Sequence, residues 1–154
     1  MKFFIFLFFI SLNVSADFSE NCPRQSIPNT CVFYEKCLEE KNTCGIEGYP
    51  LGYGLKYCNE FNGMELSENG EKWIEQTMLC LQNELAPYAE EKTSCEVIKN
   101  EAFNTHVFCY VNSGFCELPA KDKLIIGTTN LWTVVKTEEG RKQAVETLIK
   151  CMQK

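Results

Sequence analysis

The chain has 154 residues, a formal net charge of −6 and ten cysteines. Its acidic balance gives it no attraction for nucleic acid or anionic lipid. The basic Lys2, the apolar run 3–12 and the small-residue pattern Val14-Ser15-Ala16 predict a signal peptide over residues 1–16. That run is too short to span a bilayer, and no later stretch approaches the required length. We expect residues 17–154 to be a secreted, extracellular single domain without a membrane span, carrying a net charge of −7 once Lys2 is removed.

The first part of the expected mature chain predicts two short helices separated by a loop. A helix through Glu40 is capped by Asn29 or Thr30. Residues 41–54 contain four glycines and end in G-Y-P-L-G-Y-G, which favours a loop. Helical spacing resumes over residues 55–61.

Two longer amphipathic stretches predict an antiparallel pair of helices at the centre of the fold. Ser67 caps the first helix and Pro87 ends it, and Thr93 caps the second. The apolar stripes are Ile74, Met78, Leu81 and Leu85 in the first helix, and Cys95, Ile98, Ala102, His106 and Cys109 in the second. Cys80 and Cys109 lie on the inner faces, so a covalent bond between the two helices is expected.

The last part of the chain predicts two more helices. Gly114 ends the central pair, and Pro119 opens a helix that runs to about Val135. Thr137 caps the final helix, whose apolar face is formed by Val145, Leu148, Ile149 and Met152. Since no stretch alternates as a strand would, we expect an all-α, disulfide-rich bundle of five or six helices.

The cysteines and the sole histidine favour structural roles. An even number of cysteines behind a signal peptide indicates a disulfide framework, and no C-x-x-C pair suggests a zinc or redox site. His106 lies on an inner helical stripe, and no nucleophile, metalloprotease or phosphate-loop motif accompanies it. Residues 17–154 contain two aspartates and no calcium-binding loop. We expect no catalytic residue, no cofactor and no metal site.

Three tyrosines recur at intervals of four within and after the glycine-rich loop: Tyr49, Tyr53 and Tyr57. Tyrosine is favoured at interfaces, so these residues are candidates for binding a protein partner. The alternative, which we favour, is that they pack over the disulfide cluster. The apolar residues in 131–135 have the same two possible roles: they pack in the core or they form a contact face for a partner.

Short motifs accompany the cysteines along the chain. They are C-L-E at 37–39, C-N-E-F at 58–61, S-E-N-G at 67–70 and L-I-K-C at 148–151. Together with ten cysteines in the same order, these motifs resemble the stanniocalcin family over nearly the whole of residues 17–154. The resemblance implies the disulfide pairs Cys22–Cys37, Cys31–Cys58, Cys44–Cys95, Cys80–Cys109 and Cys116–Cys151.

The chain departs from the family pattern at three places. It lacks the further cysteine that links two subunits in vertebrate members, so we expect no covalent dimer and leave a non-covalent one open. Asn42-Thr43-Cys44 replaces the family's glycosylation site and is not an ordinary acceptor. The interval between Cys44 and Cys58 is also longer.

The resemblance implies a secreted, non-enzymatic signalling or regulatory protein with hormone-like activity in calcium and phosphate homeostasis, acting through an extracellular receptor. One alternative is a rigid binding module that inhibits an extracellular protease through a protruding loop. Another is a small lipid-binding helical effector, with a cavity lined by residues such as Trp73, Phe103 and Trp132.

Overall fold

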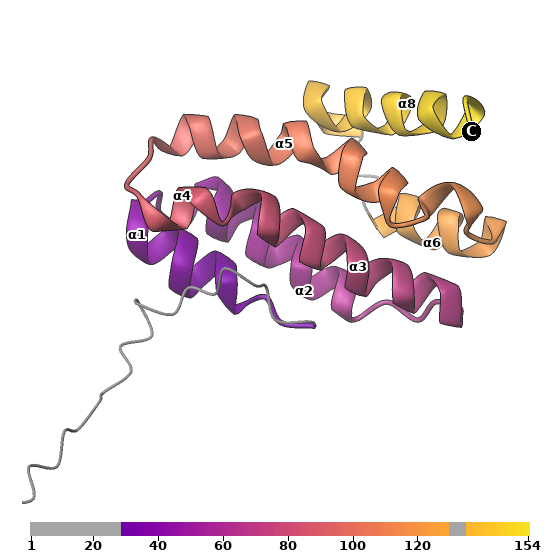
Figure 1. Ribbon diagram of the computed structural model, residues 1–154, viewed down its shortest axis with the longest axis horizontal. Coiled ribbons are helices and arrows are strands. Elements are labelled where there is room, and N and C mark those ends of the chain that lie inside the picture. The colour runs from indigo at the N-terminus through magenta and orange to yellow at the C-terminus, as the bar shows by residue number, and fades with distance from the viewer. Residues whose placement is uncertain (1–28, 130–134) are drawn as a thin grey trace, which may run out of the picture.

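The computed structural model describes residues 29–129 and 135–154 (Figure 1). All secondary-structure elements in these ranges are helical, which confirms the all-α, disulfide-rich fold class. In chain order they are η1 (Phe33–Glu39), α1 (Glu40–Asn42), η2 (Tyr49–Leu55), α2 (Lys56–Asn62), α3 (Glu68–Leu85), α4 (Pro87–Glu90), α5 (Cys95–Asn112), η3 (Phe115–Glu117), α6 (Ala120–Thr129) and α8 (Glu138–Met152).

These segments outnumber the five or six helices expected from the sequence because the helical pitch changes within continuous stretches. η1 and η2 are wide π-helical turns that run directly into α1 and α2. α4 is a short turn that starts at Pro87. The predicted helix from Pro119 is described as α6, and residues 130–134 lie outside the described ranges.

The central pair consists of α3 and α5, which lie along one another in the middle of the molecule (Figure 1). The Cys80–Cys109 disulfide joins them, and the Trp73 indole donates a hydrogen bond to the Tyr110 carbonyl oxygen at 3.1 Å. Ser67 caps α3 as predicted, because its hydroxyl accepts from the Gly70 amide. α8 packs on the far side of α5, so the fold is layered around this pair.

The predicted cap of α5 is displaced by one residue. Ser94, not Thr93, accepts a hydrogen bond from the Val97 amide. The amide of Thr93 instead donates to Asn42 Oδ1 at 2.7 Å. Asn42 is buried and also donates to the carbonyls of Leu38 and Tyr88, so it ties α1, α4 and the start of α5 together. This buried amide leaves no room for a glycan.

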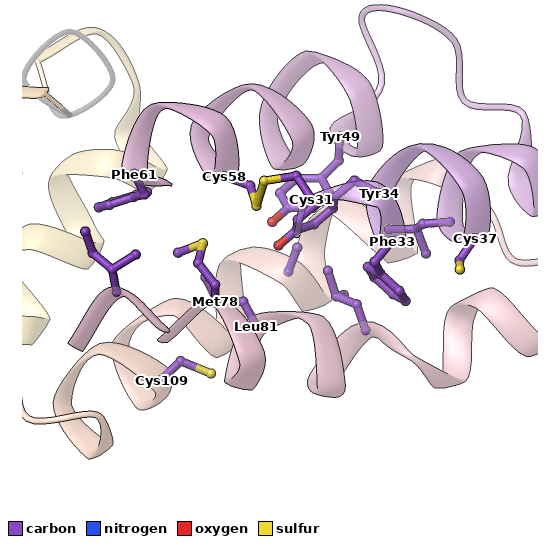
Figure 2. Close-up of a cluster of buried hydrophobic side chains, with 14 of the residues drawn as sticks. Cys31, Phe33, Tyr34, Cys37, Tyr49, Cys58, Phe61, Met78, Leu81 and Cys109 are labelled. Carbon is purple, nitrogen blue, oxygen red and sulfur yellow. A yellow bond between two sulfur atoms is a disulfide. The ribbon is translucent and has the colours of Figure 1, made fainter. Parts of the chain in front are cut away.

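The expected loop over 41–54 is confirmed only for residues 43–48, because α1 continues to Asn42 and η2 begins at Tyr49. Within η2, Gly54 permits close packing against a neighbouring helix. A Cβ atom at Gly54 would overlap the ring of Tyr34, which η1 supplies. Figure 2 shows Tyr34 and Tyr49 in the cluster between η1 and η2, beside the Cys31–Cys58 disulfide. The spacing of four between the tyrosines therefore reflects a helix.

The final helix begins at the predicted cap, Thr137, but its apolar face does not point inward. Val145, Leu148, Ile149 and Met152 are between 42% and 78% exposed. The inward stripe instead contains Gly140, Ala144, Thr147 and Cys151. Because Cys151 is bonded to Cys116, the disulfide determines which face of α8 turns toward the molecule. The small residues of this stripe let the helix lie on α5.

We predict that Gly54→Ala lowers the free energy of unfolding by about 2–3 kcal/mol, because the added Cβ meets the buried Tyr34 ring. Urea denaturation with the disulfides intact measures this loss. Gly63→Ala is the matched control, since a Cβ there would lie 3.6 Å from its nearest neighbours. Its stability should stay within about 0.5 kcal/mol of wild type. Equal stability of the two variants would refute close packing at Gly54.

Candidate functional site

The structure contains four of the five disulfides that the resemblance implied. They are Cys31–Cys58, Cys44–Cys95, Cys80–Cys109 and Cys116–Cys151. Cys37 is also disulfide-bonded. Cys22, its expected partner, lies outside the described residues, so that pair remains a prediction.

The three candidate partner-binding tyrosines form part of an aromatic cluster. Tyr49 is 6% exposed and stacks on Tyr53, with ring centroids 5.5 Å apart. Tyr53 lies against Tyr57 at 4.4 Å and against Phe103 of α5 at 4.9 Å. Burial raises the pKa of Tyr49 well above its ordinary value. Tyr49 therefore cannot serve as a surface contact, and the half-buried Tyr53 and Tyr57 pack beside it.

His106 is a packed residue of α5, as expected from its position on the inner stripe. It is 3% exposed, and its ring lies 5.5–6.0 Å from those of Phe103, Tyr110 and Tyr53. Its Nδ1 atom has no hydrogen-bond partner in the described part of the chain. Burial lowers the pKa of His106 from 6.5 to about 4. The ring is consequently neutral at physiological pH.

An apolar cavity lies between the C-terminal part of α5, α6 and α8. Its volume is about 250 Å³. The lining residues are Tyr53, Tyr110, Phe115, Lys123, Ile126, Gly127, Gly140, Gln143, Ala144, Thr147 and Leu148. α8 packs along α5, whereas α6 lies farther from both helices, and the cavity occupies the space between them.

Three small residues keep this space open. Gly127 lies on α6, and Gly140 and Ala144 lie on α8. A Cβ atom at Gly127 would have no neighbour within 4 Å. The small size of these three residues is the sequence signal that could have indicated a space here.

Lys123 is the only charged residue among the described residues that line the cavity. Lys123 as a whole is half-buried, and its ammonium group donates a hydrogen bond to the Cys116 carbonyl oxygen at 2.6 Å. That bond uses one of the three N–H donors of the ammonium group. The other two have no partner among the described residues.

Of the residues proposed for a lipid-binding site, neither Trp73 nor Phe103 is among the described residues that line the cavity. Trp73 is 1% exposed and packs in the core against Phe61, Tyr110 and Phe115. Phe103 borders a separate, more polar groove with Asn100 and Glu139. Trp132 lies outside the described residues. A cavity is thus present, and it is lined by Tyr53, Tyr110 and Phe115, on which Trp73 and Phe103 pack.

No cluster of three or more His, Cys, Asp or Glu side chains suited to a metal occurs within 29–129 and 135–154. In the same ranges, no helix combines the length and apolar character needed to cross a bilayer. Comparisons of the chain with family models, with curated proteins and with solved structures give no significant match.

We predict that burial of neutral His106 makes stability depend on pH. The unfolded chain binds the proton with a pKa near 6.5 and the folded chain with a pKa of about 4. Stability is therefore complete above pH 6.5 and falls as the pH drops toward 4, by about 3 kcal/mol from this residue. Urea unfolding of wild type and His106→Phe across this interval tests the effect. The wild type should lose more stability than the variant, and parallel curves would contradict the prediction.

Proposed function

We propose that this protein is a secreted, non-enzymatic regulatory protein of stanniocalcin type that acts by binding an extracellular receptor. The observation that supports the proposal is the disulfide connectivity. Sequence spacing alone leaves roughly 945 pairings of ten cysteines open. Four bonds that the resemblance implied are present together. The disulfides also fit an oxidising compartment.

A receptor contact on α8 suits this proposal. Its exposed apolar side chains Val145, Ile149 and Met152 recur at helical spacing and form one face, and Leu148 lies between this face and the cavity. Exposed apolar faces of this kind often mark protein-binding surfaces. Cys116–Cys151 holds the end of the helix, so the face is presented on a fixed support.

The alternative of a protease inhibitor has less structural support. It relied on a rigid body with a protruding glycine-tyrosine loop. That stretch forms η2, and Tyr49 points into the core. The described residues therefore offer no reason to prefer a protease over a receptor as the partner.

Binding of the labelled protein to epithelial cells of the source organism tests the proposal. We expect saturable binding, displaced by unlabelled protein, together with a change in calcium or phosphate uptake. Protein that has been reduced and alkylated is the control for non-specific adhesion. Absence of both displaceable binding and altered ion uptake would refute the hormone-like role.

Paired variants test the contact surface. Val145→Ser combined with Ile149→Ser should weaken cell binding about tenfold or more, because it removes two apolar anchors from α8. Ile46→Ser is the matched control, since Ile46 is 76% exposed and lies far from α8 in the sequence. Equal binding of both variants would exclude this face of α8 as the contact.

A further inference from the structure

The apolar cavity goes beyond the proposed receptor function, because it has the size and lining of a small-molecule site. Its volume of about 250 Å³ exceeds that of an engineered cavity of about 150 Å³ that binds benzene. It is smaller than the roughly 300–1,000 Å³ typical of drug-sized pockets. A ligand of roughly ten to fifteen non-hydrogen atoms would fit a cavity of this volume.

The helices around the cavity are held apart by fixed attachments. Cys116–Cys151 connects α8 to the segment that follows α5. At the start of α6, the buried Asp122 carboxylate accepts hydrogen bonds from the Ser67 amide and hydroxyl, which anchors α6 to the beginning of α3. Since both helices are tethered independently, neither is free to close the space by moving alone. A ligand therefore enters a preformed apolar pocket and binds without the cost of rearranging these helices.

The polar groups of the lining favour one type of ligand. Most of the wall is aromatic, aliphatic or glycine, which suits a hydrocarbon chain or ring. Lys123 adds one positive charge, and two of its N–H donors lack a protein partner in the described ranges. Within residues 29–129 and 135–154, no acidic residue lines the cavity to neutralise that charge. A carboxylate head group complements the ammonium, while the hydrocarbon part occupies the apolar wall.

We propose that the cavity between α5, α6 and α8 binds a medium-chain amphiphile with a carboxylate head group, oriented with that carboxylate at Lys123. Gly127, Gly140 and Ala144 provide the space for the hydrocarbon part. The ligand crosses from the aromatic wall of Tyr110 and Phe115 to the small-residue stripe of α8.

Titration calorimetry of the disulfide-intact protein with decanoate and decanol tests the head group. Decanoate should bind at one site per chain, about tenfold more tightly than decanol, because a charge-assisted hydrogen bond is added. Lys123→Met should remove this preference and leave decanol binding unchanged. Lys121→Met is the matched control, because Lys121 is exposed and is not among the residues that line the cavity. Equal affinity of the wild type for both probes would overturn the head-group assignment.

Two variants at one position test the location. Gly127→Leu should abolish binding of both probes, because its side chain fills the cavity. Gly127→Ala should retain binding and melt at a temperature equal to or above that of the wild type, since alanine is the better helix former and its Cβ meets no neighbour. Ala144→Leu fills the space from the opposite wall and gives a second loss-of-binding variant if Gly127→Leu melts early.

The outcomes separate clearly. No binding of either probe to folded wild type would overturn the site. If Gly127→Leu and Ala144→Leu both bound the probes as tightly as the wild type, the ligand would bind elsewhere, and the proposed site would also be refuted. Cell binding through the exposed face of α8 is measured independently, so failure of this site and failure of the receptor proposal are distinguishable.

Discussion

The packing of α3 against α5 is the contact on which the other helices depend. Trp73 and Ile98 are almost completely buried within it, and Cys80–Cys109 crosslinks its two members. The bond closes a sequence separation of 29 residues, which in the chain-entropy model contributes about 3–4 kcal/mol. η1 and α2 pack on α3, whereas η2, η3 and α8 pack on α5. Each outer layer therefore takes its position from this pair.

The helices before α3 and those after α5 are attached to the central pair in two different ways. The proposed binding features lie only in the layer after α5. The N-terminal layer is densely packed, with Gly54 against Tyr34 and with Cys31–Cys58 beside them (Figure 2). The C-terminal layer is held by tethers at Asp122 and Cys151. Tethers fix position without filling space, so this layer combines a cavity with an exposed apolar helix face. Both features proposed for binding lie there.

Sequence reasoning could predict the helices and their caps where local chemistry dominates. Ser67, Thr137 and Gly114 mark element ends as expected, because capping and positive φ depend on neighbouring residues. It failed at η2, because the four glycines of residues 41–54 suggested a loop, although the packing of Gly54 on Tyr34 requires a glycine in a helix. Sequence reasoning also gave α8 the wrong orientation. The hydrophobic pattern indicates which face of a helix can be buried, but the Cys116–Cys151 disulfide determines which face of α8 is buried. The cavity arises where α5, α6 and α8 meet, so the small residues that line it indicate a space, whereas its position depends on how these helices pack.

Native-state hydrogen exchange under non-reducing conditions tests most directly whether the α3–α5 pair supports the fold. Amides in the middle of α3 and α5 should exchange most slowly and open only with global unfolding. Those of α6 and α8 should exchange faster, through local opening that leaves the pair intact. If α6 or α8 proved as protected as α5, or if α3 exchanged first, the account of a central pair with tethered outer helices would be contradicted.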